Sequence, residues 1–328
     1  MKQIALTGIT GHLGAAVAHT LCQQGLSVRA LVRRQPAWLA KLPGITCVSG
    51  DILDPGTLPA FLEGCAGLIH CAGVISIHGD PGGIVHRTNV LGTANVLQAA
   101  ANCGVRRAVH VSSIHAYEQL PVDAVLNESR ELVGSSGFPY DRSKREGQEV
   151  ALSLNSGVLE VMVVNPTAVI GPYDYKPSRI GKVIIGLLTG RQKFITEGGF
   201  DFCDSRDVAY AILRALEAGR SGESYVLSGK WSALQELVDV LSLVSGRSIH
   251  PVRCPLWLAR AALPLAEGVQ YFTSAEPVFT RESLAAVQNG NTAVSSNKAA
   301  AELGYRARPL PDTLRDTYNW FWSNGFLN

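Results

Sequence analysis

Hydrophobic residues recur along this chain in two alternating patterns. Short runs rich in β-branched side chains are followed by longer segments that are apolar at helical spacing. This alternation is typical of a parallel sheet whose faces are covered by helices, so we predict an α/β protein with a doubly wound parallel sheet. The predicted strands span residues 2–6, 27–32, 45–50, 67–72, 107–113 and 158–166, and residues 224–229 are expected to return to the same sheet.

Helices are predicted between these strands, at residues 12–24, 55–64, 88–104 and 140–157, and again at 204–219. A glycine closes each of the second, third and fourth segments, and we expect it to cap the helix C-terminus. Ligands of doubly wound sheets bind beyond the carboxyl ends of the strands, near the point where strand order reverses. Polar residues that directly follow the strands are therefore expected to share one crevice.

The stretch TGITGHLG, residues 7–14, lies between the first strand and the first helix. Its three glycines allow positive φ angles and close approach of another group, because glycine has no Cβ. The N-terminus of the next helix directs unpaired N–H groups and a positive dipole end to the same place, which suits a pyrophosphate. The stretch therefore predicts a nucleotide-binding turn, with an ordinary strand-to-helix turn as the alternative.

The alternation of strands and helices stops after residue 170, where Gly171, Pro172 and Pro177 interrupt it. A smaller lobe is predicted to begin there, and the chain returns to the sheet once before its end. We expect residues 1–169 and 203–229 to form the nucleotide-binding domain, and residues 170–202 and 230–328 to form a smaller C-terminal substrate-binding lobe.

The most apolar part of this lobe is residues 254–272. Arg260, Pro264 and Glu267 interrupt it, so it does not fit an integral membrane span, which needs about 20 apolar residues. We expect an amphipathic helix that lines a substrate pocket, and attachment to a membrane surface is the alternative.

Composition narrows the class of protein. Hydrophobic residues make up 46% and charged residues 17%, enough for a large core, and 29 basic against 27 acidic residues predict neither nucleic acid nor an acidic membrane as partner. The seven cysteines are scattered without a C-x-x-C pair, so we expect reduced thiols and no metal. No apolar run of signal-peptide length precedes the glycine turn, which favours a cytoplasmic protein.

Candidate chemistry lies at Tyr140 and Lys144. Four residues apart on one helix, they share a face, and a nearby ammonium would lower the pKa of the phenol toward working pH. Such a tyrosine can donate and accept a proton. The hydroxyl pair Ser112-Ser113, at the end of the preceding strand, is expected to enter the same crevice.

In this order along the chain, the motifs resemble the extended short-chain dehydrogenase/reductase superfamily (the NAD-dependent epimerase/dehydratase family). The sequence is most similar to its branch of dihydroflavonol reductases and 3β-hydroxysteroid dehydrogenases, and the resemblance covers nearly the whole chain. It rests on T-G-x-x-G-x-x-G at 7–14, H-x-A at 70–72, N-V-x-G-T at 89–93, Y-x-x-x-K at 140–144, N-P-T at 165–167, R-D-V-A at 206–209 and SSNKAAAELGY at 295–305.

The resemblance implies a Rossmann fold and a role for each matching residue. Tyr140 is the implied general acid/base, Lys144 binds the nicotinamide ribose, and Ser113, rather than Ser112, hydrogen-bonds the substrate oxygen. His115 and Tyr117 are expected either to line the substrate side or to pack the loop. The implied cofactor-binding residues are Thr7, Gly8, Thr10, Gly11, His12, Leu13, Gly14, Arg33, Arg34, Asp51, Ile52, Ala72, Tyr140, Lys144, Pro166 and Thr167.

The residues after the second strand favour NADP as the cofactor. An NAD enzyme would place an acidic residue about 20 positions past the glycines, whereas this chain has Arg33 and Arg34 there. Arginine suits a 2′-phosphate because its guanidinium presents a fork of donors. The next acidic residue, Asp51, is assigned to the adenine by the resemblance.

These expectations lead to one preferred function and two alternatives. The preferred one is an NADP(H)-dependent oxidoreductase that acts on a ketone or secondary alcohol of a small organic substrate. The first alternative is an NAD-dependent nucleotide-sugar epimerase or dehydratase, and the second is a non-catalytic nucleotide-binding sensor. The identity of the substrate, and whether the chain forms a homodimer, stay open.

Overall fold

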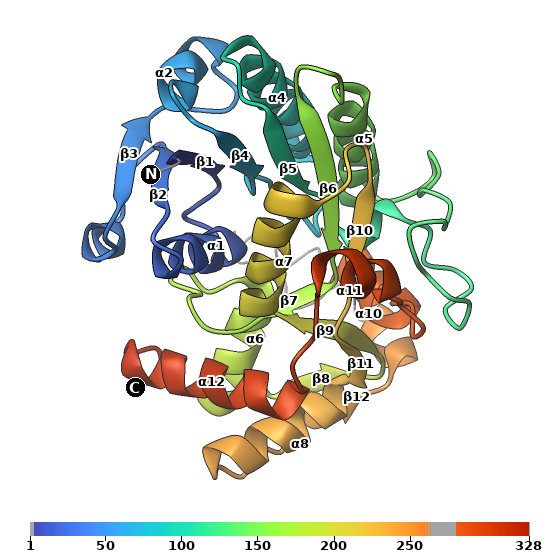
Figure 1. Ribbon diagram of the computed structural model, residues 1–328. Helices are drawn as coiled ribbons and strands as arrows, with labels where there is room; N and C mark the ends of the chain where they lie inside the picture. The colour runs from blue at the N-terminus through green and yellow to red at the C-terminus, as the bar shows by residue number, and fades with distance from the viewer. Residues whose placement is uncertain (1–2, 262, 264–279, 328) are drawn as a thin grey trace.

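The computed structural model describes residues 3–261, 263 and 280–327. Seven parallel strands form the main sheet, in the order β3-β2-β1-β4-β5-β6-β10 (Figure 1). All of the predicted strands are present in it, which confirms the doubly wound α/β fold. Their bounds are β1 Gln3–Thr7, β2 Ser27–Val32, β3 Ile45–Ser49, β4 Gly67–His70, β5 Arg107–Val111, β6 Glu160–Pro166 and β10 Ser224–Leu227.

Helices cover both faces of this sheet (Figure 1). On one face the core contains apolar side chains of α1, α7 and α11, and on the other it contains those of α2, α4 and α5. The bounds are α1 His12–Gln23, α2 Leu58–Leu62, α4 Gly92–Asn102, α5 Pro139–Ser153, α7 Ser205–Ala218 and α11 Asn297–Leu303.

The helix ends agree only in part with the glycine caps that the sequence predicts. Gly64 and Gly104 follow their helices with φ of 69° and 76°, the left-handed geometry of a C-cap. The prediction was wrong at Gly157. Helix α5 ends at Ser153 with Leu154 as its cap, because the Leu154 N–H reaches the carbonyl of Val150 without a left-handed residue.

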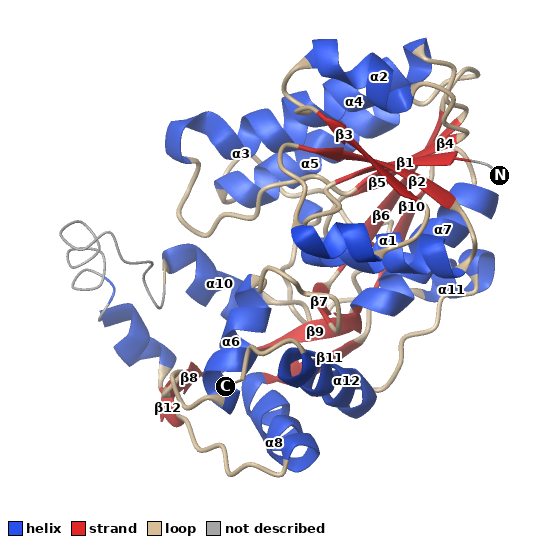
Figure 2. Ribbon diagram, turned by 90° about the vertical axis from the view of Figure 1, so that its left-hand side faces the viewer, coloured by secondary structure: helices blue, strands red, loops and turns tan. Residues whose placement is uncertain are grey.

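A second layer of structure lies at one end of the sheet (Figure 2). Two small sheets occur there, with the orders β11-β9-β7 and β12-β8, and they pack with helices on a separate apolar core. This separate core supports the predicted division into two domains, which stays a prediction. The bounds are β7 Ala168–Ile170, β8 Phe194–Thr196, β9 Gly199–Asp204, β11 Lys230–Ala233, β12 Val252–Cys254, α6 Arg179–Leu188, α8 Leu234–Ser245, α10 Arg281–Asn289 and α12 Leu310–Ser323.

Most of the apolar segment 254–272 lies outside the described residues, so its expected role at a substrate pocket stays a prediction. The described part is amphipathic, because Ala259 and Leu263 are buried with Leu284 whereas Trp257 is exposed. Among the described residues, no helix is both long and apolar enough to cross a membrane.

Strand order reverses at β1, which lies between β2 and β4. The chain winds from β1 through β2 to β3 on one side, and from β4 through β5 to β6 on the other. The segments after β1 and β4 therefore border the crevice where doubly wound sheets bind ligands.

Candidate active site

The glycine turn joins β1 to α1 exactly where strand order reverses. Gly8 has a φ of 72°, and a Cβ there would lie 2.5 Å from the amide nitrogen of Ala72, the second residue after β4. A Cβ on Gly14 would lie 2.1 Å from the carbonyl oxygen of Gly8. At Gly11, in contrast, a Cβ would lie 3.4 Å from its nearest neighbour, the Gly8 carbonyl oxygen, which is an ordinary contact distance. Gly11 is also exposed. Gly8 and Gly14 are thus required for close packing of the turn, whereas Gly11 has room for a side chain or a ligand beside it.

Buried hydroxyl and imidazole groups hold this turn against β4. The Thr7 hydroxyl lies 2.6 Å from Nδ1 of His70 and accepts a hydrogen bond from the Ala72 amide at 3.3 Å. On its other side, His70 contacts the Thr93 hydroxyl at 3.1 Å. Burial lowers the pKa of His70 to about 3, so the ring is neutral at physiological pH.

Helix α5 brings Tyr140 and Lys144 to the carboxyl end of β5. The Lys144 ammonium donates to the carbonyl of Val111, the last residue of β5, at 3.0 Å. Ser112 donates from its hydroxyl to the Lys144 carbonyl at 3.4 Å, and Ser113 hydrogen-bonds the Tyr140 phenol. The structure therefore brings together the three residues that the sequence singled out, with Ser113, not Ser112, beside the phenol.

The pKa of Tyr140 differs in direction from the sequence-based expectation. Burial raises the pKa of Tyr140 to about 12, although its hydrogen bond with Ser113 acts in the lowering direction. The Lys144 ammonium donates its hydrogen bond to the Val111 carbonyl and not to the phenol. Burial lowers the pKa of Lys144 to about 8. The phenol is therefore protonated at neutral pH in this structure.

The residues after β2 and β3 meet at the edge of the crevice. Arg33 directly follows β2, its side chain is 82% exposed, and its guanidinium lies 4.0 Å from the Asp51 carboxylate. Asp51 also accepts a hydrogen bond from the Leu53 amide at 3.0 Å. The carbonyl of the buried Ile52 accepts from Asn95 of α4 at 3.0 Å, which fixes this loop. Arg34 is exposed beside Arg33.

The other expected cofactor-binding residues have different surroundings, and their role stays a prediction. Pro166 ends β6, and Thr167 donates from its hydroxyl to Asp201 at 2.7 Å. Thr10 is exposed on the glycine turn, whereas Leu13 packs against the core.

The two residues expected after Ser113 have different surroundings. Tyr117 is buried in a small apolar cluster, and its phenol accepts from Gln148 at 3.4 Å, so it packs the loop. His115 remains partly exposed, with Nδ1 3.0 Å from the Asp141 carboxylate and its ring 5.7 Å from that of Tyr140. His115 is thus the one of the two that lies beside the phenol.

Comparison with known proteins places this geometry in a family. Residues 4–228 match the model of the NAD dependent epimerase/dehydratase family. The chain belongs to this family. It is 31% identical to sterol demethylase protein B of Methylococcus capsulatus over 98% of this chain and 99% of the relative. It is also 31% identical to a putative dihydroflavonol 4-reductase of Synechocystis, over 98% and 95%.

A solved structure agrees in fold. A nucleoside-diphosphate-sugar epimerase from Pseudomonas aeruginosa superposes with a TM-score of 0.80, at 24% identity, over 100% of this chain and 99% of that one. The resemblance to the extended short-chain dehydrogenases/reductases is thereby confirmed. As a member of the epimerase/dehydratase family, the protein is assigned to a class of enzymes that use a nicotinamide cofactor.

In the sequence, Asn89 is only the first residue of a motif, and no role was assigned to it. Asn89 is buried in a π-helical turn, Arg87–Leu91, that precedes α4. Its side chain accepts from the Val74 amide at 2.8 Å and donates to the Val74 carbonyl and to the Ser143 hydroxyl. Asn89 thus ties the segment after β4 to α5, one residue from Lys144. The signal in the sequence is the N-V-x-G-T motif that Asn89 begins.

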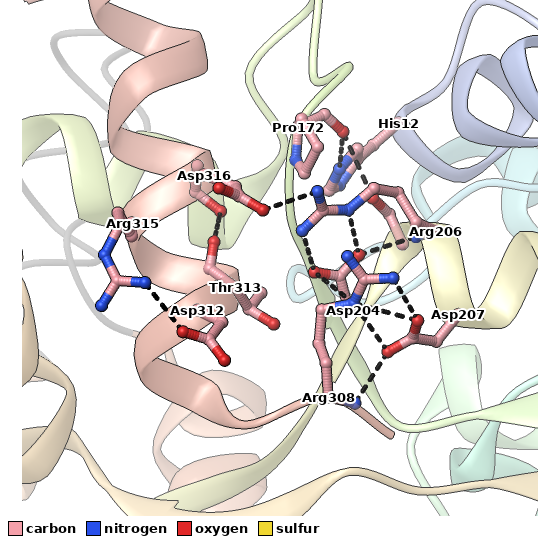
Figure 3. Close-up of polar contacts among 12 residues, drawn as sticks. His12, Pro172, Asp204, Arg206, Asp207, Arg308, Asp312, Thr313, Arg315 and Asp316 are labelled. Atoms are coloured by element: carbon pink, nitrogen blue, oxygen red, sulfur yellow. Dashed lines mark hydrogen bonds and ion pairs between the residues drawn. The ribbon is translucent and has the colours of Figure 1, made fainter. Parts of the chain in front are cut away.

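The glycine turn is also tied to the loop after β7. His12, the first residue of α1, lies 3.1 Å through Nε2 from the carbonyl oxygen of Pro172, and that oxygen also accepts from Ser205 at 3.2 Å (Figure 3). Nδ1 of His12 lies 4.0 Å from the buried carboxylate of Asp174. One carbonyl therefore connects the starts of α1 and α7.

Ion pairs extend this connection to the C-terminal helix (Figure 3). Arg206 donates to Asp204 at 2.7 Å and to Asp316 of α12 at 2.6 Å, and Arg308 donates to Asp207 at 2.6 Å. Burial alone would raise the pKa of Asp204, but hydrogen bonds from Arg206 outweigh it, so this pKa lies below its ordinary value. All of these charges are paired. Arg206 and Asp207 of the R-D-V-A motif therefore connect the start of α7 to the C-terminal part of the chain. No cluster suited to a metal ion occurs within residues 3–261, 263 and 280–327.

Beside His70, a second buried histidine predicts a pH dependence of stability. His110 of β5 stacks on His70 with ring centroids 5.4 Å apart, and neither of its ring nitrogens has a hydrogen-bond partner among the described residues. Burial lowers the pKa of His110 well below its ordinary value. Below pH 6.5 the unfolded chain therefore binds a proton that the folded protein does not, so stability falls as the pH falls.

We expect His110→Leu to reduce this loss of stability. Removing an unpaired polar ring should cost little at pH 7, and the fall in unfolding free energy between pH 6.5 and 5 should become shallower by up to about 1.4 kcal/mol per pH unit. Denaturant unfolding at both pH values measures it, with the exposed His250→Leu as the control substitution. An unchanged slope would contradict the assignment of a neutral His110.

Proposed function

We propose that this protein is an NADP(H)-dependent oxidoreductase that transfers a hydride between the nicotinamide and a ketone or secondary alcohol of a small organic substrate. The observation that carries the proposal is the convergence of Ser113, Tyr140 and Lys144 at the carboxyl end of β5. β5 lies beside β4, one strand from the point where strand order reverses, and its carboxyl end lies on the same edge of the parallel sheet as the glycine turn after β1.

The residues of the crevice fit a dinucleotide. Gly11 leaves open space above the N-terminus of α1, where N–H groups favour a pyrophosphate. Arg33 reaches the same edge with a largely exposed guanidinium, which suits a 2′-phosphate, and Asp51 lies beside it for the adenosine. Ala72, Pro166 and Thr167 would line the path toward the nicotinamide.

When bound, the cofactor supplies the hydride, and the chain supplies position and the proton. In the reductive direction Tyr140 would give its phenolic proton to the oxygen of the substrate carbonyl as that group becomes an alcohol. A phenol with a raised pKa is protonated at neutral pH, as a donor must be. Ser113 orients the carbonyl oxygen by a hydrogen bond, and Lys144, held at the Val111 carbonyl, binds the ribose.

The relatives support a carbonyl or alcohol substrate and leave its size open. One is named for a sterol and the other for a dihydroflavonol, and both molecules are built on fused rings. We therefore extend the proposal to a largely apolar ketone or alcohol. His115, which lies beside Tyr140 and is paired with Asp141, would contact its polar end.

The proposal is tested by assaying the purified enzyme with NADPH and NADH against a panel of ketones, with cyclic apolar ketones included. We expect NADPH oxidation with at least one apolar ketone and a preference for NADPH over NADH. A protein that purifies with tightly bound NAD and turns over nucleotide sugars without net oxidation would instead be an epimerase. Binding of the dinucleotide without turnover of either class would favour a sensor.

The glycine turn gives a prediction that separates binding from folding. Gly11→Val places a branched side chain in the open space above α1, so we expect a folded protein whose NADPH affinity falls at least about tenfold. Gly14→Val is the contrast, because its Cβ would overlap the Gly8 carbonyl and should lower the thermal midpoint. Fluorescence titration with NADPH and thermal unfolding separate the two. Unchanged affinity in Gly11→Val would make the turn purely structural.

A further inference from the structure

Four large apolar side chains are exposed on β8, on β12 and on the helical segment that follows β12. Phe194 on β8 and Val252 on β12 are direct neighbours in the parallel register of this two-stranded sheet, and they are 48% and 60% exposed. Trp257 and Leu258, in the first turn of the helical segment after β12, are 70% and 46% exposed. We call these four residues the apolar corner.

The elements that carry the apolar corner belong to the second layer, away from the seven-stranded sheet. Figure 2 shows β8, β12 and the helical segment that follows them gathered at one extremity of the second layer. The buried side of that segment packs through Ala259 and Leu263 onto Leu284 of α10. The helical segment that carries Trp257 and Leu258 is therefore packed onto α10.

The charges around the apolar corner are mostly positive. Arg191, Lys193, Arg253 and Arg260 are exposed next to it in sequence, and none makes an ion pair with a described residue. Arg253 and Arg260 donate instead to the neutral side chains of Gln235 and Gln288. Exposed cations without an ion pair also occur elsewhere on the described surface, as at Arg34 and Arg306, so the relevant feature of this region is the position of four cations next to exposed apolar side chains.

We propose that the apolar corner docks on the surface of a membrane that contains anionic lipids. A tryptophan and aliphatic side chains enter the boundary between headgroups and acyl chains, and the four cations contact the headgroups. Near an anionic surface each lysine or arginine strengthens binding by about fivefold. This attachment is peripheral, and it does not depend on the proposed reductase activity.

The apolar corner is less suited to binding a second copy of the chain. In a twofold dimer the same patch meets itself, so four unpaired cations of one copy would face four of the other. Like charges brought together across an interface disfavour association. An anionic lipid surface meets the same charges with attraction.

Vesicle sedimentation tests the proposal with the full-length protein. We expect binding to vesicles of phosphatidylcholine with phosphatidylglycerol, and at least tenfold weaker binding to phosphatidylcholine alone or at high salt. Trp257→Ser with Leu258→Ser, and separately Lys193→Glu with Arg253→Glu, should each reduce binding at least tenfold. The matched controls are Leu243→Ser, at an exposed apolar position of α8, and Arg315→Glu, at an exposed cation of α12.

Three outcomes would overturn the proposal. The first is no binding of the wild type to anionic vesicles. The second is equal loss of binding in the control and corner variants, checked as folded by circular dichroism. The third is self-association of the wild type in sedimentation velocity that is lost in the Trp257→Ser variant, although this variant still binds vesicles as the wild type does. None of these measurements uses turnover, so a failure here is distinguishable from a failure of the proposed reductase function.

Discussion

Tyr140→Phe is expected to lower turnover by about 10²–10⁴-fold while NADPH binds nearly as in the wild type. The substitution removes only the phenolic oxygen, which Ser113 hydrogen-bonds and which carries the proton for the substrate oxygen. The half-buried ring keeps its packing, so the fold should be retained. Steady-state rates with a substrate ketone, together with fluorescence titration of NADPH, measure the two effects separately.

Two further variants make this result specific. Tyr117→Phe removes a buried phenol that contacts Gln148 away from Lys144, so its turnover should stay near that of the wild type. Lys144→Ala should lower both turnover and NADPH affinity, because the ammonium is proposed to bind the ribose. Retention of more than about a tenth of wild-type turnover in Tyr140→Phe would place the proton donor elsewhere.

Arg33→Asp is expected to reverse the choice of cofactor. Loss of one hydrogen bond to a charged group costs about 1.5–3 kcal/mol, or roughly ten- to a hundredfold in affinity. The new carboxylate would also lie near Asp51, whose oxygen is 4.0 Å from the present guanidinium, and two negative groups there repel a 2′-phosphate. The affinity for NADPH should therefore fall by more than the loss of one contact predicts. NADH, in contrast, gains an acceptor for its 2′-hydroxyl.

The ratio of kcat/KM for NADPH and NADH in wild type, Arg33→Asp and Arg34→Asp measures this effect. Arg34 is exposed one position further from β2, so its variant should shift the ratio less. A wild type that prefers NADH would exclude the assignment of Arg33 to the 2′-phosphate and would favour the epimerase alternative.

The pattern of strands and helices could be predicted because most of the central parallel strands, such as β4 and β6, are buried on both faces and so read as nearly continuous apolar runs. Tyr140 and Lys144 could be placed together because four residues make about one helical turn. Their surroundings could not be predicted in the same way. The hydrogen bond from Lys144 to Val111 and the burial that raises the pKa of Tyr140 depend on how α5 meets β5, which local spacing does not determine.

Contacts between distant segments were likewise absent from the local pattern. The carbonyl of Pro172 joins His12 and Ser205 across more than 30 residues in either direction, and no spacing rule encodes it. The predicted end of α5 was wrong for a related reason. A backbone hydrogen bond closed the helix at Leu154 before the chain reached Gly157.

The position of β10 at the edge of the main sheet has a consequence for synthesis on the ribosome. β6 pairs with β5 on one side, but its partner on the other side, β10, is made only after the segments that form α6, β8, β9 and α7. Until residues 224–227 emerge, the edge of β6 from Val163 to Pro166 has no strand beside it. An open apolar edge is a site for aggregation, so a nascent or truncated chain that ends before β10 should need a chaperone more than the complete one.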